Sequence, residues 1–474
     1  MTAVKEPEGP QSRRGLAVYY GGLLLAAAVV FLLVRSYGET LTPGVPASPA
    51  TAPHAAPGVD ALPHILFVLG AVVLIGRALA RLLAPLRQPP VIGEVLAGIL
   101  LGPSLLGPDL AARILPPETS SALAVVAQLG VILFMFLIGL EFDFGFLRRR
   151  AHAAVAISHA GIVVPFLLGA TLAIGLYPRL ATEGVRFTTF ALFLGVAMAI
   201  TAFPVLARIL TDRGLERTPL GILALGVAAV DDVTAWCLLA IVLGLARAEV
   251  GGTALVVGGA LAFIAIMVFG ARPLLARLSA RGPDRLGEGS VAAVFVALFA
   301  CALIADRIGI HAIFGAFLLG AVMPHEGPVA RFFERRLRLA VTVFLLPAFF
   351  AYTGMRTRID LMSGGEAWAI CGLIVLVATL GKLGGVFMAA RAAGVERREA
   401  AGLGALMNAR GLMELIVLNI GLEMGVISPV LFSMMVVMAI VTTMSSAPLL
   451  WLFLGDPKRP APESARRAAA RSPD

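Results

Sequence analysis

Long runs of apolar residues alternate with short charged clusters along almost the whole chain. A helix that crosses a membrane needs about 20 apolar residues, and fourteen segments of this sequence approach or exceed that length. Their predicted positions are 16–34, 63–84, 91–108, 121–147, 153–177, 188–210, 219–246, 252–271, 289–306, 308–323, 339–355, 367–390, 399–421 and 427–453. The pattern therefore predicts an all-α polytopic membrane protein.

The two ends of the chain differ from this apolar centre. Residues 1–62 are expected to hold an anchor helix and then a linker rich in proline and alanine. A basic start followed by an apolar stretch is also typical of a cleaved signal peptide, but the length of the stretch at 16–34 favours a retained helix. Residues 63–454 form the expected transmembrane domain, and residues 455–474 form a short basic tail.

Composition and charge agree with this interpretation. Hydrophobic residues make up 59% of the chain and charged residues only 14%, whereas an average soluble protein has roughly 25% charged residues. The net charge of +9 comes from residues in loops between the spans, so no nucleic-acid partner is expected. The lipid bilayer is the expected partner.

Basic residues concentrate in alternate loops, as the positive-inside rule requires. These loops contain Arg148, Arg149, Arg150, Arg208, Arg213, Arg217, Arg272, Arg277, Arg281, Arg285, Arg331, Arg335, Arg336, Arg338, Arg391, Arg397 and Arg398. The alternation predicts a multi-pass protein of the inner (plasma) membrane with both termini in the cytoplasm.

The chain carries signs of an internal repeat. The string Ala-Gly-Ile-Leu-Leu-Gly at 97–102 is echoed by Gly-Ala-Phe-Leu-Leu-Gly at 315–320. Each string lies in the second helix of a six-helix block, if the blocks run over 63–246 and 289–453. The single helix at 252–271 that joins them would make the second block enter from the opposite face, which predicts two inverted repeats of the kind common in secondary transporters.

The fifth helix of each block is interrupted. The first contains Thr201 and Pro204 in mid-span, and the second contains Asn408 and Gly411. Proline lacks a backbone donor and clashes with the preceding turn. Interruptions at corresponding positions of two halves indicate a transport site, although an ordinary proline kink and a glycine packing notch are the structural alternatives.

Two adjacent acids, Asp231 and Asp232, lie in the middle of the sixth span. Neighbouring helix residues point about 100° apart, so the two carboxylates face different surroundings. A carboxylate binds a hard monovalent cation or a proton through the same oxygens, and the two ions therefore compete for it. This chemistry makes the pair the candidate cation- and proton-binding site, with the monovalent cation at Asp232.

Three further charges lie at membrane depth and need partners. Lys382 is expected to pair with Asp231, either as part of the transport chemistry or as a static salt bridge that fixes helix packing. Arg410 and Glu414 are four residues apart on one helical face, which favours a structural ion pair. No cofactor is expected.

With these residues in place, the chain resembles the second branch of the monovalent cation/proton antiporter superfamily. That branch includes bacterial sodium/proton antiporters, glutathione-gated potassium efflux systems and plant cation/proton exchangers. The matching strings lie at 90–103, 201–208, 231–232, 309–317 and 408–421.

The resemblance implies an inverted-repeat antiporter fold with core and dimerisation domains, elevator-type alternating access and a homodimer. Two broken helices would cross beside the aspartates, with Thr201 and Asn408 at the crossing. By position, Asp232 resembles the carboxylate that binds the cation and the proton, and Asp231 resembles the second acid, paired with Lys382.

The expected function is secondary active, electrogenic exchange of Na⁺ or K⁺ for protons in pH and cation homeostasis, without enzymatic activity. Plant relatives usually carry Asn-Asp and potassium efflux systems Gln-Asp where this chain has Asp231 and Asp232. The double acid resembles electrogenic sodium/proton exchangers, and the choice between sodium and potassium stays open. A gated potassium efflux channel or transporter, and an exporter of a charged organic molecule on the same fold, are the alternatives. An intramembrane aspartyl protease is disfavoured because adjacent helix residues diverge.

Overall fold

The structure, a computed structural model, is almost entirely helical and confirms the predicted fold class. It describes residues 10–45, 61–86, 88–114, 116–141, 151–215, 218–247, 253–279, 288–324 and 327–455. Most of the predicted linker and the predicted basic tail lie outside these ranges. Within them, an isolated β-bridge joins Val45 to Thr182.

The first half of the chain contains the helices α1 (Pro10–Gly38), α2 (Ala61–Leu83), η1 (Ala84–Leu86), α3 (Pro90–Leu101), α4 (Pro103–Ile114), α5 (Pro117–Glu141), α7 (Ala151–Leu180), α8 (Phe187–Ala199), α9 (Phe203–Arg213) and α10 (Pro219–Arg247). The second half contains α11 (Thr253–Ala265), η2 (Ile266–Ala271), α12 (Arg272–Ser279), α13 (Glu288–Ile308), α14 (Ala312–Val322), α15 (Pro328–Ala340), η4 (Val341–Leu345), α16 (Leu346–Arg356), η5 (Ile359–Leu361), α17 (Gly365–Ala392), α18 (Arg397–Met407), α19 (Leu412–Glu423) and α20 (Pro429–Leu454).

Among the described residues, ten helices are individually long and apolar enough to cross a membrane. The other predicted segments correspond to interrupted or short helices. One is the pair α3 and α4, which is bent by 59°. Two are the broken pairs α8/α9 and α18/α19, and the last is α14, an apolar helix of 11 residues. The chain is therefore a multi-pass membrane protein whose irregular spans coincide with predicted segments.

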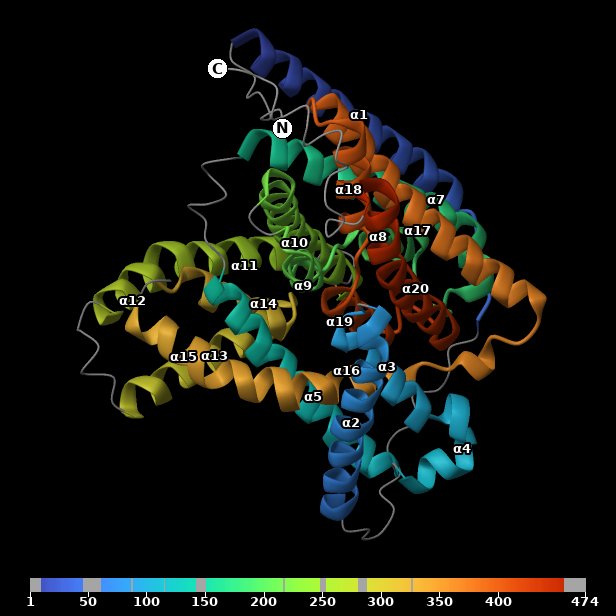
Figure 1. The fold of residues 1–474 in the computed structure, drawn as a ribbon, viewed down its shortest axis with the longest axis vertical. Coiled ribbons are helices and arrows are strands. Elements are labelled where there is room, and N and C mark those ends of the chain that lie inside the picture. Colours follow the sequence, from blue (N-terminus) through green and yellow to red (C-terminus); the bar gives the residue numbers. More distant parts are fainter. Residues whose placement is uncertain are drawn as a thin grey trace, which may run out of the picture.

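The helices pack into two bundles (Figure 1). The core bundle, in the upper part of the view, consists of α7, α8, α9, α10, α17, α18, α19 and α20. The scaffold bundle, in the lower part, consists of α2, α3, α4, α5, α13, α14, α15 and α16. Helix α11 follows α10 and also packs on α13, so it connects the two bundles in sequence and in space.

Packing in the scaffold bundle supports the inverted repeat. Helix α3, the second of the first block, meets α16, the third of the second block, at Gly98 and Gly354. Helix α14 meets α5 at Gly320 and Gly139 in the reciprocal arrangement. A methyl group added to Gly354 or to Gly320 would lie 2.9 Å from the Cα atom of the facing glycine. Small residues permit this close backbone approach in lipid, where no hydrophobic effect drives helices together.

Helix α1 packs on the core bundle, against α7 and α8. The rings of Phe31 and Phe166 lie 5.8 Å apart between their centroids, and the hydroxyl of Thr188 donates a hydrogen bond to Glu39. The sequence predicted this extra helix without indicating its neighbour. Because α1 contacts the core bundle, any movement of that bundle would carry it along.

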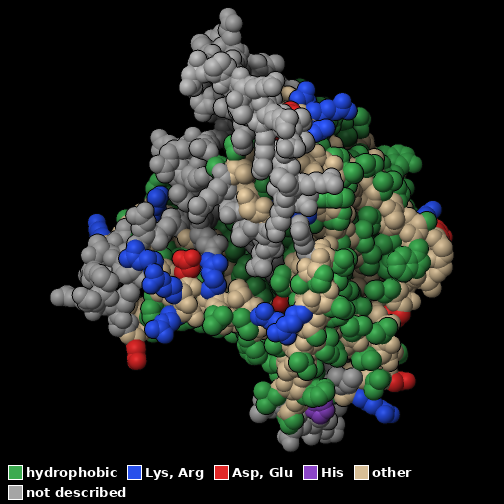
Figure 2. Space-filling view, viewed as in Figure 1, with side chains coloured by type: hydrophobic (Ala, Val, Ile, Leu, Met, Phe, Trp, Pro, Cys, Tyr) green, Lys and Arg blue, Asp and Glu red, His purple; other side chains and the backbone are tan. Residues whose placement is uncertain are grey.

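The surface matches a bilayer environment. In Figure 2 hydrophobic side chains cover much of the described face, whereas lysine and arginine form a few small clusters. Exposed large hydrophobic residues include Leu25, Phe67, Phe269, Val296 and Leu452. Contiguous exposed apolar surface of this kind is expected where lipid takes the place of water.

Candidate functional site

Two broken helices cross at the centre of the core bundle. Helix α8 ends at Ala199 and α9 begins at Phe203, while α18 ends at Met407 and α19 begins at Leu412. The extended segments between them are hydrogen-bonded to each other: the backbone N–H of Ala202 donates to the carbonyl of Ala409 over 3.0 Å. The predicted interruptions in the two repeats therefore meet in space.

The predicted crossing residues lie at these interruptions. The Thr201 hydroxyl donates to the carbonyl of Met407, the last residue of α18, over 3.0 Å. Asn408 donates from its amide to the Thr442 carbonyl over 3.3 Å. Pro204 occupies the second position of α9, where a missing N–H leaves no intrahelical bond unmade. Gly411 precedes α19 in an extended conformation, with φ 171°.

Asp231 is fully buried and has a partner for each oxygen. Its Oδ2 atom accepts a hydrogen bond from Nζ of Lys382 over 2.8 Å, which is also a salt bridge. Its Oδ1 atom accepts from the hydroxyl of Ser158 over 3.4 Å. The structure thus places Asp231 in the expected pair with Lys382.

Lys382 uses all three of its N–H groups. Besides the bond to Asp231, its Nζ atom donates to the carbonyls of Gly161, over 3.0 Å, and Ala199, over 2.5 Å. A buried ammonium needs such a complete set of acceptors, because an unpaired charge in the interior is strongly destabilising. The lysine therefore joins three elements, α7, α8 and α10, around one buried charge.

Arg410 performs a similar role at the two preceding carbonyls of α8. Its guanidinium donates to the carbonyls of Ala197, over 2.9 Å, and Met198, over 2.5 Å, and to Oε2 of Glu414, over 2.7 Å. The expected pair of Arg410 and Glu414 is therefore present and fully buried.

Two cations therefore cap one half-helix. The carbonyls of Ala197, Met198 and Ala199 are the last three of α8, and each accepts a hydrogen bond from Arg410 or Lys382. The carboxyl end of a helix carries partial negative charge and unsatisfied carbonyls. The interruption of α8 is thus stabilised by the same charges that surround the aspartates.

Asp232 differs from its neighbour. The residue is 8% exposed, and its carboxylate accepts a hydrogen bond from the backbone N–H of Phe203 at the start of α9. Its Oδ1 atom is buried without a hydrogen-bond partner among the described residues. A buried polar atom without a partner costs free energy, so the arrangement favours an additional ligand at this oxygen.

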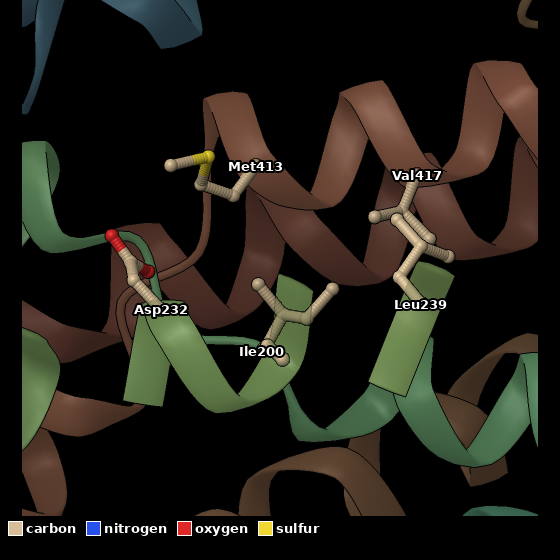
Figure 3. A pocket seen from close by; sticks show the side chains of 6 residues that line it. Ile200, Asp232, Leu239, Met413 and Val417 are labelled. Atoms are coloured by element: carbon tan, nitrogen blue, oxygen red, sulfur yellow. The ribbon is translucent and has the colours of Figure 1, made fainter. Parts of the chain in front are cut away.

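A small cavity of about 10 Å³ adjoins this carboxylate. Ile200, Asp232, Leu239, Met413 and Val417 line it together with Ala235, and Figure 3 shows Asp232 and Leu239 on one helix facing Met413 and Val417 on another. A space of this size is about the smallest that holds one water molecule. Apart from Ile200, which directly follows α8, its lining residues belong to α10 and α19.

Other buried oxygen atoms around the crossing also have no hydrogen-bond partner among the described residues, namely Asn408 Oδ1 and Glu414 Oε1. Oxygen atoms are the ligands that hard cations prefer. The crossing therefore combines the Asp232 carboxylate with an amide oxygen and a carboxylate oxygen that could each accept a further ligand.

Sequence reasoning missed several residues of this site. Ser158 gave no signal as a lone hydroxyl in an apolar run. The polar cluster at 442–446 of α20 was visible as Thr-Thr-Met-Ser-Ser within a span, and its hydroxyls support the crossing: Thr443 accepts from the backbone N–H of Arg410 over 2.9 Å. A polar cluster inside a predicted span is the signal that would have identified it.

Comparison with known proteins agrees with this geometry. Residues 70–452 match the family described as sodium/hydrogen exchanger, transmembrane. The chain belongs to this family.

Two relatives and one solved structure illustrate the likeness. The chain is 43% identical over 396 residues to "Na(+)/H(+) antiporter NhaS4" of Synechocystis, covering 82% of this chain and 96% of that one. It is 34% identical over 387 residues to "K(+)/H(+) antiporter 1" of Saccharomyces cerevisiae, covering 79% of this chain and 44% of the yeast protein. The fold is similar to that of the sodium proton antiporter MjNhaP1 from Methanocaldococcus jannaschii, with a TM-score of 0.60 and 14% identity over 84% of this chain and 99% of that one.

Proposed function

We propose that the protein is a secondary active antiporter that exchanges a monovalent cation, Na⁺ or K⁺, for protons at Asp232. One observation carries the proposal, namely that the adjacent aspartates differ. Both oxygens of Asp231 have a partner, whereas Asp232 has a buried oxygen that accepts no hydrogen bond from the described part of the chain and lies beside a cavity. The printed names of the two relatives, one a sodium and one a potassium antiporter, support the substrate class.

Exchange follows from the chemistry of one carboxylate. When Asp232 is protonated, its oxygens no longer attract a cation, and when it is ionised it binds one with help from neighbouring oxygens. Proton and cation therefore occupy the site in turn. The backbone N–H of Phe203, at the start of α9, is directed at this side chain.

Alternating access would come from movement of the core bundle. All the groups that surround Asp232 belong to that bundle, and the scaffold bundle is packed separately through its glycine contacts. A rigid-body shift of one bundle against the other would carry the intact site between two aqueous sides, as in elevator-type transporters.

We further propose that exchange is electrogenic. A cation bound at Asp232 places a positive charge next to Asp231 and its partner Lys382. A lysine, unlike an arginine, can release a proton when its surroundings change. A second proton leaving the Asp231–Lys382 pair would make the proton count exceed the cation count, so a net charge would cross in each cycle.

The first experiment is exchange in proteoliposomes. Internal pH is followed with a trapped dye while Na⁺, K⁺, Li⁺ or Rb⁺ is added outside. We expect a pH change with Na⁺ or K⁺ and none with a large organic cation. A pH trace that ignores every monovalent cation would contradict the proposed function.

The second experiment imposes a membrane potential. A net charge moved across the membrane is worth about 2.3 kcal/mol per 100 mV, so an inside-negative potential should speed proton entry and cation exit. A potassium/valinomycin potential serves if the first experiment excludes K⁺ as a substrate. A rate that does not respond to the potential would assign Lys382 a packing role.

The remaining expectations stay predictions. A homodimer, both termini in the cytoplasm and an inner (plasma) membrane location are consistent with this function. Chemical cross-linking in the membrane would test the dimer, and reporter fusions at residues 3 and 470 would test the orientation.

A further inference from the structure

A polar network joins the two bundles where α16 meets α19. Arg356 of α16 donates to Oε1 of Glu423 over 3.0 Å and to Oδ1 of Asn419 over 3.3 Å. The Asn419 amide donates to the hydroxyl of Thr353 over 2.7 Å. Gln128 of α5 also donates to Glu423, over 3.5 Å. Three residues of the scaffold bundle, Thr353, Arg356 and Gln128, thus contact Asn419 and Glu423 of the core bundle.

The network lies beyond the Asp232 cavity on the same helix. Met413 and Val417 of α19 line that cavity, and Asn419 and Glu423 occupy the next turns of α19. Figure 1 places α19 and α16 side by side where the bundles meet. Asn419 is only 5% exposed, so its hydrogen bonds are made in the interior, between the cavity and the end of α19.

This end of the molecule is the predicted extracytoplasmic one. Helices α16 and α19 both end here, and the loops that follow them, at 357–364 and 424–428, alternate with the arginine-rich loops. A second contact joins the two bundles at this end: the backbone N–H of Arg358, just after α16, donates to the hydroxyl of Ser433 on α20 over 2.7 Å.

Among the described residues, a neutral contact joins the bundles at the opposite end. Helices α3 and α16 run in the same direction, because Gly98 faces Ala351 and Gly102 faces Met355. Gln88, just before α3, therefore lies at the end away from Arg356. Its amide donates to the Met444 carbonyl of α20 over 3.3 Å, a neutral bond, whereas the α16–α19 network contains an ion pair.

We propose that Thr353, Arg356, Asn419 and Glu423 form a latch that closes the extracytoplasmic path to Asp232 and must open in every exchange cycle. The proposal rests on the proposed function, because it assumes that the core bundle moves against the scaffold bundle. Bonds within a bundle survive such a movement, but bonds of fixed length between bundles do not. The latch therefore biases the protein toward the state in which this side is closed.

The first test fixes the latch covalently. With the three native cysteines replaced, Thr353→Cys is combined with Asn419→Cys, and the pair is oxidised in proteoliposomes. We expect exchange to fall to the background of empty liposomes and to return on reduction. The control pair is Ser104→Cys on α4 with Asp360→Cys on η5, whose native oxygens lie 3.3 Å apart. Neither residue belongs to the core bundle, so oxidation of this pair should leave exchange unchanged.

The second test weakens the latch. Arg356→Gln is compared with Arg358→Gln, because Arg358 makes a similar ion pair with Asp360 on its own loop. Each variant carries Val417→Cys, a cavity position, as a probe for a membrane-impermeant thiol reagent. We expect Arg356→Gln to raise the labelling rate from the extracytoplasmic side roughly two- to fivefold, as the loss of one partly exposed ion pair allows, and Arg358→Gln to leave it unchanged.

The outcomes separate the latch from the proposed function. Exchange at the full rate by the oxidised Thr353–Asn419 pair would overturn the latch and leave the antiporter intact. Equal labelling in the two arginine variants would also overturn it. Thiol labelling of Val417→Cys does not depend on exchange. It therefore tests the latch even if the first proteoliposome experiment finds no antiport.

Discussion

The core bundle and the scaffold bundle join their helices in contrasting ways. At the core crossing the helices stop, exchange backbone hydrogen bonds and bury the charges of Asp231, Asp232, Lys382, Arg410 and Glu414. In the scaffold bundle α3 and α16, and likewise α14 and α5, continue past each other with glycine against glycine. The scaffold bundle also buries Glu94, but near the start of α3 and with Arg77 as a neighbouring charge.

The contrast indicates where the transport chemistry lies. Burying ions in a bilayer protein is costly, and an ion pair is often no more stabilising than packed apolar residues. If the helices only had to pack against one another, glycine contacts of the kind seen in the scaffold bundle would be sufficient in the core bundle too. We therefore expect changes at the crossing to alter exchange and changes at the glycine contacts to alter stability.

The largest expected effect is that of Asp232→Asn. The amide keeps the shape of the side chain but binds neither a proton nor a cation by charge, so exchange should fall to the background of empty liposomes. The unfolding temperature should stay near that of the wild type, because no partner of Asp232 loses a counter-charge. Asp360→Asn is the control, since it makes the same change in a surface pair. Measurable antiport by a folded Asp232→Asn protein would contradict the proposed site.

The next effect concerns the neighbouring pair. Asp231→Asn leaves the ammonium of Lys382 buried without its counter-charge, which should lower the free energy of unfolding by about 3–5 kcal/mol. Adding Lys382→Gln removes the stranded charge and should restore most of the loss. The double variant should still exchange, but without response to an imposed potential. Thermal unfolding in detergent measures the stability, and the valinomycin assay measures the response to potential. A double variant less stable than Asp231→Asn would contradict the pairing of Asp231 with Lys382.

A smaller effect is expected in the scaffold bundle. Gly354→Val and Gly320→Val place a side chain against facing backbone, and overpacking of this kind costs about 1–3 kcal/mol. Gly372→Val is the matched control, because nothing lies within 4 Å of a methyl group added there. The cation preference of the protein that folds should equal that of the wild type. A change in preference would show that the scaffold bundle shapes the site.

The buried charges and the helix interruptions of the core bundle could be predicted from the sequence. Charges are so rare inside apolar spans that Lys382 had few possible partners, and Arg410 and Glu414 were four apart on one helix. The helix interruptions at Thr201 and Asn408 could be predicted because proline, glycine and polar residues are uncommon together in the middle of an apolar span.

Other parts had no sequence signal. The acceptors of Lys382 and Arg410 are backbone carbonyls of α8, and every residue has a carbonyl. The facing glycines were visible only as a repeat of small residues, because pairing depends on the tertiary arrangement. Arg356 and Glu423 lie near helix ends, where charged residues are ordinary in a membrane protein, so only the structure joins them.

The smallest effect should come from Ser158→Ala, which removes the weaker partner of Asp231. The Ser158 hydroxyl donates to Oδ1 over 3.4 Å, near the limit of a hydrogen bond, while the Lys382 bond of 2.8 Å remains. We expect the free energy of unfolding to fall by less than about 1 kcal/mol and the cation concentration for half-maximal exchange to stay the same, because Asp232 is untouched. Ser446→Ala is a suitable control, since that buried hydroxyl donates to the carbonyl of Thr442 on its own helix, over 3.0 Å, rather than to a carboxylate. If Ser158→Ala shifts the cation dependence while Ser446→Ala does not, Asp231 contributes to cation binding, and the distinction between a structural and an exchanging aspartate must be replaced by a shared site.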